Sequence, residues 1–525
     1  MTDHKKITGF ISHVTAATSI SRILGYFRDM LIAHYFGAGL FADAFYAAYR
    51  IPNLFRRLFG EGSVSSAFVP VFSDYIQTKK REETAQLLNV VFTVLVIILF
   101  IITVASIIFS KQISQSIAWG FKSSPEKLLL TTDLTRIMFP FLFFACLAAL
   151  AMGVLNSLKS FFLPAIAPAS LSVSEILYVL LFLALCPWAT GIPDDFKIRG
   201  LAISVVIGGF IQFAIQQAAL AKHGFRMKFN FNLSNPGLKK IIVLFLPVSI
   251  GFSVEQINSF VDTICASFLV EGSITALYYS NRIMQLPLAL FGIAAATVSL
   301  PLMSESVAKN DREGMVQTLN FSLRLVLFTL IPASLGLIVI GMPIIEVLFE
   351  RGSFTGSATA MTYSALALYS TGLLAYAFVK ILAGGFYAMK ETRIPIRTSA
   401  FCMMLNIPLN IILMRRMGIG GLALATAICS WINFILLFYY LRKRTGPLGS
   451  RKIIRTFVKV ASAAIIMVIV TYLASTFKYP LGILKLVVPV LSGLATYISV
   501  SKLLGIEELK PVLGLFMKGA PTGED

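Results

Sequence analysis

Charged residues are scarce in this chain, and their scarcity excludes an ordinary soluble protein. Asp, Glu, Lys and Arg together make up 13% of the 525 residues, whereas hydrophobic residues make up 57% and the mean hydropathy is +0.81. Soluble globular domains carry about 25% charged residues. The composition therefore predicts an all-α polytopic membrane protein, with room for about 14 transmembrane helices of about 20 residues each.

Cysteine and histidine are also few, which argues against several kinds of site. The five cysteines lie apart in apolar stretches without C-x-x-C spacing, so we expect neither a disulfide framework nor a cysteine metal site. The four histidines show no metal-ligand spacing either. There is no Walker loop and no convergent acid–base or metal site, so we expect no enzyme and no bound cofactor. The N-terminal run MTDHKKITGF does not resemble a cleaved signal peptide.

Acidic residues are outnumbered by basic ones, 25 against 45, which gives a formal net charge of +20. A nucleic-acid partner is not expected, because the basic residues lie in short loops between apolar runs or inside those runs. With a cytoplasmic N-terminus, the inner loops hold Lys79–Arg81 and residues 222–240, 390–397 and 442–455. The positive-inside rule then places both termini in the cytoplasm. Arg415–Arg416 is the one exception, because this basic pair falls in an outer loop.

Apolar runs set the expected helices, and their even number places both termini on one side. The loops between them are short, so no large soluble domain is expected. The predicted spans lie near 9–35, 40–60, 87–109, 128–156, 163–186, 199–221, 241–269, 274–303, 316–340, 358–388, 396–414, 420–441, 456–476 and 482–504.

An internal repeat organises these spans. Ala44–Gly60 (AFYAAYRIPNLFRRLFG) matches Ala276–Gly292 (ALYYSNRIMQLPLALFG), so that Arg50 falls on Arg282. Further matches follow in the same order, which is hard to obtain by chance. We therefore expect two six-helix lobes in parallel repeat plus two C-terminal helices. Transporters of this kind bind substrate between their lobes. The predicted divisions are 1–240 for the N-lobe, 241–441 for the C-lobe and 442–525 for the C-terminal helices and tail.

The stretch from Ser21 to Asp74 holds more charge than a lipid-facing segment tolerates. One charge at the bilayer centre costs about 2.5–3.5 kcal/mol on insertion scales. These side chains should therefore line a wet cavity or pair inside a bundle, and a cationic cavity implies an anionic substrate. The charges of the first two spans are Arg22, Arg28, Asp29, Asp43, Arg50, Arg56, Arg57 and Glu61.

Spacing groups these charges into two lines. Helix positions seven apart differ by only about 20° in azimuth, so Arg22 and Asp29 share a face. Asp43, Arg50 and Arg57 form a second line at the same interval. Arginine suits a pyrophosphate because its planar fork donates two hydrogen bonds to phosphate oxygens.

Other readings stay open for some of these cations. Arg56 and Arg57 could snorkel to the membrane interface, and the other arginines could pair with acids for structural reasons alone. Arg282 supplies a cation from the second lobe at the position equivalent to Arg50. Arg324 and Lys380 are undecided.

A fainter cluster of oxygen-bearing side chains suggests a coupling ion. Asp262 lies in the seventh span, Asn406 and Asn410 lie one turn apart in the eleventh, and Thr426 lies in the twelfth. Such ligands suit a hard cation such as Na+. The alternative is ordinary hydrogen bonding between helices, which polar residues provide in membranes.

The charged stretch also resembles a known family. SRILGYFRD and FADAFYAAYRIPNLFRRLFGEGSVSSAFVPVFSDY closely resemble segments of the bacterial lipid II flippases of the MurJ/MviN family, within the multidrug/oligosaccharidyl-lipid/polysaccharide exporter superfamily. YYSNRIMQLPLALFGIAAATVSLPLMS, LFERGSFT and GGFYAMKETRIP are similar to further family segments. The resemblance implies transfer of undecaprenyl-diphosphate-linked peptidoglycan precursor from the inner to the outer leaflet of the cytoplasmic membrane.

The resemblance also implies residue roles. Asn410 departs from the family, since an acid stands there in some members, which weakens the sodium hypothesis. The family's cavity arginines match Arg22, Arg28, Arg56 and Arg282, and its acids match Asp29, Asp43 and Glu61.

We therefore expect an alternating-access flippase whose partners are the lipid-linked precursor, membrane lipids and cell-wall synthases. Its energy source, a membrane potential or an ion gradient, is left open. The alternatives are export of another lipid-linked oligosaccharide and a non-transporting scaffold for cell-wall synthesis. A cationic drug is a poor fit to an arginine-rich cavity.

Overall fold

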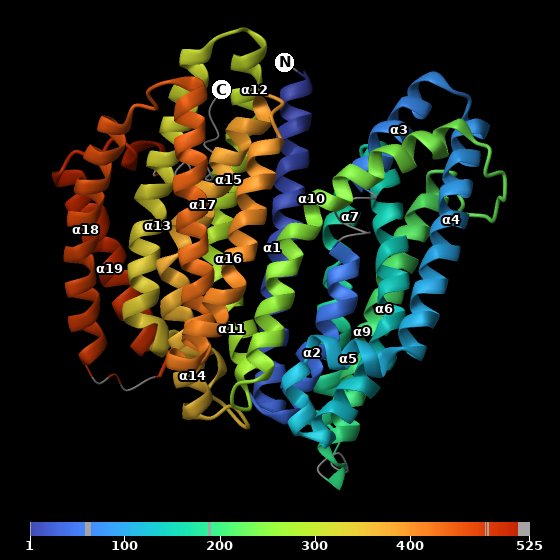
Figure 1. Ribbon diagram of the computed structural model, residues 1–525, viewed down its shortest axis with the longest axis horizontal. Helices are drawn as coiled ribbons and strands as arrows, with labels where there is room; N and C mark the ends of the chain where they lie inside the picture. The colour runs from blue at the N-terminus through green and yellow to red at the C-terminus, as the bar shows by residue number, and fades with distance from the viewer. Residues whose placement is uncertain (1, 58–64, 187–190, 478, 480–481, 513–525) are drawn as a thin grey trace. The chain divides into compact units, whose positions relative to one another are not determined.

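The computed structural model describes residues 2–57, 65–186, 191–477, 479 and 482–512. Within these ranges the regular secondary structure is entirely helical, as Figure 1 shows, which confirms the predicted all-α class. Nine of the described helices are long and apolar enough to cross a membrane, or ten if the bent pair Gly356–Thr371 and Leu373–Ala388 forms one span. The count of 14 spans stays a prediction.

Every predicted span overlaps one or more of the described helices, whether or not that helix is long enough to cross a membrane, and several spans are broken. The first unit described below contains α1 (Thr2–Phe36), α2 (Leu40–Phe55), α3 (Ser65–Thr78), α4 (Arg81–Ile108), α5 (Ser110–Ile117), α6 (Pro125–Ser157), α7 (Phe162–Ile166), α8 (Ala169–Tyr178), α9 (Asp194–Lys222) and α10 (Pro236–Ser267). The second contains most of α11 (Ser273–Pro287), then α12 (Ala294–Ala308), α13 (Arg312–Phe349), α14 (Gly356–Thr371), α15 (Leu373–Ala388), α16 (Arg393–Met417), α17 (Ile419–Thr445), α18 (Ser450–Thr476) and α19 (Leu484–Leu503).

Packing divides the chain into two compact units. The first comprises residues 1–275 with 351–354, and the second comprises 276–350 with 355–525. This division differs from the predicted boundary at residue 240, because α10 packs against α3, α4 and α5 of the first unit. Helix α10, which begins the predicted second lobe in sequence, packs on the first unit, and the lobes predicted from the repeat stay a prediction.

Helix α6 forms the core of the first unit. Its apolar window is 72% buried, against 39% for α4 and α9. Helices α2, α3, α4, α5 and α9 all pack around it. Small residues such as Ala148, Ala151 and Gly153 lie in its buried part, and small side chains let helices approach closely in membranes.

A tight turn after α1 explains why residues 351–354 belong to the first unit. Gly37 has φ of +61°, and a Cβ there would lie 2.3 Å from the carbonyl oxygen of Ser353. The Ser353 backbone N–H donates to the carbonyl of His34 at 2.8 Å. Only glycine accommodates both this backbone conformation and this close approach.

In the second unit, α13 packs against α12, α14, α15, α18 and α19. Figure 1 shows α18 and α19 running side by side. The Tyr497 hydroxyl donates to the Phe328 carbonyl at 2.6 Å, which joins α19 to α13. Arg324 of α13 contacts Glu507 at 3.0 Å and the buried Glu508 at 2.7 Å. The previously undecided Arg324 therefore holds the segment after α19 against α13.

The repeat has a counterpart in local structure. Six residues after Arg50, α2 changes to π-helical hydrogen bonding at Arg56. Six residues after Arg282, a π-helix begins at Leu288 and runs to Ile293. The next long helices, α4 and α13, begin at Arg81 and Arg312, which lie 31 residues after Arg50 and 30 residues after Arg282. The π-turns, which are common at functional sites, thus follow the matched arginines in both copies.

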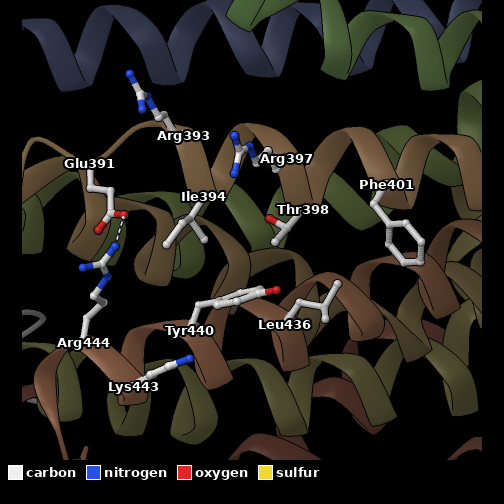
Figure 2. Close-up of a pocket in the computed structure, with 10 residues that line it drawn as sticks. All are labelled: Glu391, Arg393, Ile394, Arg397, Thr398, Phe401, Leu436, Tyr440, Lys443 and Arg444. Atoms are coloured by element: carbon white, nitrogen blue, oxygen red, sulfur yellow. Dashed lines mark hydrogen bonds and ion pairs between the residues drawn. The ribbon is translucent and has the colours of Figure 1, made fainter.

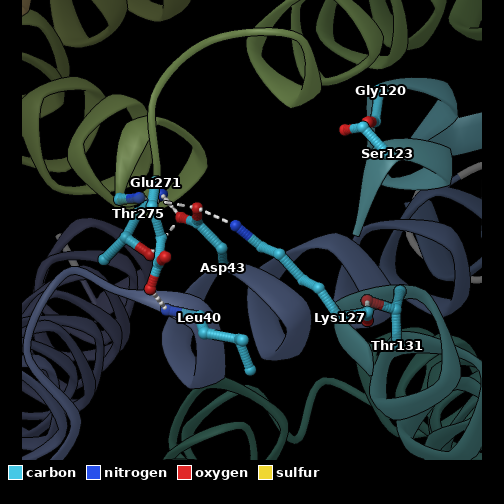
Figure 3. A network of polar contacts seen from close by, with 9 residues as sticks. Leu40, Asp43, Gly120, Ser123, Lys127, Thr131, Glu271 and Thr275 are labelled. Carbon is cyan, nitrogen blue, oxygen red and sulfur yellow. Dashed lines mark hydrogen bonds and ion pairs between the residues drawn. The ribbon is translucent and has the colours of Figure 1, made fainter. Parts of the chain in front are cut away.

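One buried carboxylate ties three parts of the first unit together, as Figure 3 shows. Asp43 of α2 is 1% exposed and pairs with Lys127 of α6 at 2.8 Å. It also accepts the backbone N–H groups of Gly272 and Thr275, at 2.8 and 2.9 Å, and the Thr275 hydroxyl at 2.7 Å. Glu271 accepts the backbone N–H of Leu40 beside it. Lys127 therefore neutralises the charge of Asp43, and the four donors together satisfy its carboxylate oxygens inside the apolar unit.

We expect Asp43→Asn to destabilise the protein by about 3–5 kcal/mol, because it leaves the buried Lys127 ammonium without its counter-charge. Thermal unfolding in detergent measures the effect. Glu126→Gln makes the same acid-to-amide change at the exposed neighbour of Lys127, and should leave the midpoint unchanged. Equal midpoints for wild type and Asp43→Asn would contradict this role for Asp43.

The end of the chain offers a second matched pair. Glu508→Ala should lower stability on the order of 3 kcal/mol, because Arg324 then loses its buried partner. Glu507→Ala, whose side chain is 82% exposed, should have little effect, since exposed ion pairs contribute little. Thermal unfolding in detergent measures both variants. Equal unfolding midpoints for Glu508→Ala and Glu507→Ala would contradict this role for Glu508.

Candidate functional site

The charges on α1 fall into two environments. Arg22 is exposed and, among the residues the structure describes, makes no hydrogen bond or ion pair. Arg28 is buried and is held by two carboxylates. Its Nε and one terminal nitrogen contact the same Asp29 oxygen at 3.0 and 2.6 Å, and its other terminal nitrogen contacts Glu175 at 2.9 Å. Arg22 and Asp29, which the sequence spacing places on one face of the helix, thus differ in environment. Arg22 is exposed, whereas Asp29 belongs to a buried ion-pair cluster.

Glu175 is a residue that the sequence interpretation did not select. It lies on α8, is 2% exposed and reaches Arg28 from 147 positions along the chain. A signal was available, because Glu175 is a solitary acid inside the apolar run predicted as the fifth span, and ionisable residues inside membranes are functional candidates by default. Lys127, the partner of Asp43, was also missed, because it lies one residue before the predicted span at 128–156.

Helix α2 holds the second line of charges. Arg50 Nε donates to the Thr263 hydroxyl of α10 at 2.9 Å. Arg56 is half-buried, and its Nε and one terminal nitrogen donate to the Asn53 side-chain oxygen at 3.0 and 2.9 Å. Arg57 is exposed. This local engagement leaves open whether Arg56 and Arg57 serve a substrate or the membrane interface.

Two predicted site residues cannot be added to this group. Glu61 lies outside the described residues. Arg282 is half-buried on α11 and belongs to the second unit, whereas Arg22, Arg28 and Arg56 belong to the first. The proposed meeting of these arginines in one space therefore stays a prediction. Lys380 is half-buried on α15, and its role also stays open.

The suggested sodium ligands are divided between the units in the same way. Asn406 and Asn410 are buried on α16, and the Asn410 amide donates to the Asn406 oxygen at 2.9 Å. Thr426 lies on α17, which packs against α16, whereas Asp262 lies on α10 of the first unit. Within the described residues, no three His, Cys, Asp or Glu side chains are placed to hold a metal.

Asp133 and Arg136 of α6 form an ion pair. Their charged groups lie 3.6 Å apart, and Arg199 of α9 also contacts Asp133 at 3.2 Å. All three side chains are partly exposed, so this cluster is a surface network rather than a binding site.

Comparison with known proteins gives a consistent result. The family model for the lipid II flippase MurJ matches residues 32–491. A probable lipid II flippase MurJ of Vibrio cholerae is 37% identical over 461 residues, which cover 86% of each chain. The lipid II flippase MurJ of Burkholderia cenocepacia is 34% identical over 460 residues, or 86% of this chain and 87% of the relative.

Solved structures agree with the sequence comparisons. A lipid II flippase MurJ in an inward closed conformation matches with a TM-score of 0.80 and 31% identity, over 93% of this chain and 98% of that one. An inward-facing multidrug resistance transporter of the MATE family matches with a TM-score of 0.66, over 82% and 96%. At 14% identity, that second likeness concerns the fold alone. The matches over most of its length show that this chain belongs to the MurJ family of lipid II flippases.

Proposed function

We propose that this protein moves lipid II, the lipid-linked peptidoglycan precursor, from the inner to the outer leaflet of the bacterial cytoplasmic membrane. The observation that carries the proposal is the family match over residues 32–491 in a chain with at least nine apolar helices of spanning length among its described residues. The charged helices α1 and α2 add a physical reason, because cations within an apolar unit suit an anionic headgroup.

In the proposed mechanism, the two lobes alternate access to a central cavity while the polyprenyl tail stays in lipid. Arg22, Arg28, Arg56 and Arg282 engage the diphosphate and its nearby sugars. A planar guanidinium can donate two parallel hydrogen bonds to a phosphate group, which gives orientation as well as attraction. Reorientation of the lobes then presents the headgroup to the opposite leaflet, and no covalent step is needed.

The different environments of Arg22 and Arg28 suggest separate roles. Arg22 is exposed on α1 and can receive a phosphate without losing a described partner. Arg28 is already bound to Asp29 and Glu175, so it must exchange a carboxylate for a phosphate to bind substrate. Such an exchange keeps the cation paired throughout, which avoids the cost of a bare buried charge. We therefore assign first contact to Arg22 and a conformation-dependent role to Arg28.

Several further features belong to the same proposal. The excess of Lys and Arg in alternate loops supports cytoplasmic termini. We propose that the protein is not an enzyme, binds no cofactor and works near cell-wall synthases. Coupling to Na+ through Asp262, Asn406, Asn410 and Thr426 stays a prediction, and transport measured with Na+ replaced by K+ tests it.

We expect Arg22→Ala to reduce lipid II translocation at least about tenfold while leaving thermal stability unchanged, because the side chain contacts substrate rather than the unit itself. Translocation into proteoliposomes measures the rate. Arg226→Ala removes another exposed arginine, from the loop before α10, and serves as the control. Arg282→Ala should reduce translocation to a similar extent. Wild-type rates for both variants would refute the role given to these two cations.

Arg28→Ala should impair both transport and folding, because it leaves Asp29 and Glu175 buried without this cation. Breaking a buried ion pair costs about 3–5 kcal/mol, so the unfolding midpoint should fall as the translocation rate falls. Glu175→Gln tests whether Glu175 positions Arg28, since this variant should alter transport while the Arg28 cation is still present. An Arg28→Ala protein of normal stability would contradict the ion-pair cluster.

Complementation separates the remaining alternatives. A flippase-depleted bacterium should be rescued by the wild-type protein and not by Arg22→Ala. A scaffold for cell-wall synthesis would instead tolerate that substitution. Translocation is also measured in vesicles that contain a different lipid-linked oligosaccharide in place of lipid II. Faster translocation of that lipid than of lipid II would indicate a transporter of another substrate.

A further inference from the structure

A second basic site lies in the second unit, between the start of α16 and the end of α17. We call it the basic groove, and Figure 2 shows it from close by. It is an open cavity of about 770 Å³. Its lining residues are Glu391, Arg393, Ile394, Arg397, Thr398, Phe401, Leu436, Tyr440, Lys443 and Arg444.

The groove carries an excess of positive charge. Its lining holds four cations and one carboxylate, so its formal net charge is +3. The carboxylate, Glu391, is already paired with Arg444 at 3.0 Å. Within the part of the chain that the structure describes, Arg393, Arg397 and Lys443 have no hydrogen-bond or ion-pair partner. Three solvent-exposed cations are therefore available to one ligand.

The start of α16 is an unfavourable place for two of these cations in the absence of an anion. Arg393 and Arg397 occupy the first two turns of α16, where the helix dipole is positive and cations are disfavoured. The N-cap residue, Thr392, makes no side-chain capping hydrogen bond, so it satisfies none of the first N–H groups. An anionic group placed here would offset both the dipole and the two guanidinium charges.

Most of the other lining residues are apolar or aromatic, which indicates an amphiphilic ligand. Figure 2 shows the charged side chains gathered near Glu391, with Leu436 and Phe401 further along. Phe401 is 50% exposed, and Met404, one turn beyond it on α16, is 60% exposed. Tyr440 adds an aromatic ring with a polar hydroxyl, a side chain typical of membrane interfaces. A charged end followed by exposed apolar side chains fits a phosphate group that continues into hydrocarbon.

We propose that the basic groove binds the phosphate headgroup of an anionic membrane phospholipid, with phosphatidylglycerol as the model ligand. The phosphate contacts Arg393, Arg397 and Lys443, and an acyl chain follows Phe401 along α16. Basic pockets between membrane helices at the cytoplasmic side bind anionic headgroups in this way. The proposal goes beyond the flippase function, and lipid binding here does not require translocation.

A direct binding measurement tests the proposal. The purified full-length protein in neutral detergent is titrated with fluorescent phosphatidylglycerol, and the dissociation constant is compared between variants. Arg393→Ala/Arg397→Ala should bind at least about tenfold more weakly, because each basic residue near an anionic headgroup contributes appreciably. The matched control is Arg415→Ala/Arg416→Ala, which removes two exposed arginines from the last turn of the same helix and should bind like wild type.

Further arms keep the test decisive if the double alanine variant folds poorly. Arg393→Lys/Arg397→Lys keeps the charge and should stay within a few-fold of wild type, whereas Lys443→Gln should weaken binding about fivefold. Equal affinity of wild type and all groove variants would overturn the proposal. It is also overturned if undecaprenyl diphosphate, but not phosphatidylglycerol, requires Arg393 and Arg397, since the groove would then be a substrate site.

Discussion

The constraint behind this structure is that a charge removed from water must find a partner. Asp43 meets it with Lys127 and three further donors, and Arg28 meets it with Asp29 and Glu175. Each arrangement joins helices that are distant in sequence, so the ion pairs that make these charges tolerable also fix the packing of the first unit. Removing one partner is costly because the other is left buried.

The same constraint separates structural charges from those available to ligands. Arg22 and the cations of the basic groove are exposed, whereas Arg28, Lys127 and Arg324 are occupied by internal carboxylates. A count of arginines in an apolar stretch cannot make this distinction, since it depends on which acids the fold brings near. The proposed mechanism uses both classes, one for first contact and one for exchange of partners.

Much of the fold was predictable from the sequence because long apolar runs leave little choice but helices. The repeat, read from Arg50 and Arg282, reappears as π-turns at the same distance after each arginine. The breaks in the fifth and tenth predicted spans fall at Pro168 and Gly372. Proline and glycine commonly interrupt helices, so the sequence carried a signal for these breaks that hydropathy alone does not read. The partners of Glu175 and Lys127, which lie 147 and 84 positions away, could not be predicted because only tertiary packing defines them. The arrangement of the cavity arginines and of the sodium ligands stays a prediction, since it requires the two units to be placed against each other.

Transport of the substrate itself is the decisive measurement for the proposed function. The wild-type protein is reconstituted into proteoliposomes with lipid II in one leaflet, and its appearance in the other leaflet is followed over time. Our account predicts protein-dependent transfer of lipid II, with little transfer of a lipid-linked oligosaccharide of different headgroup. Transfer no faster than in protein-free vesicles, under conditions where the protein is folded and inserted, would contradict it.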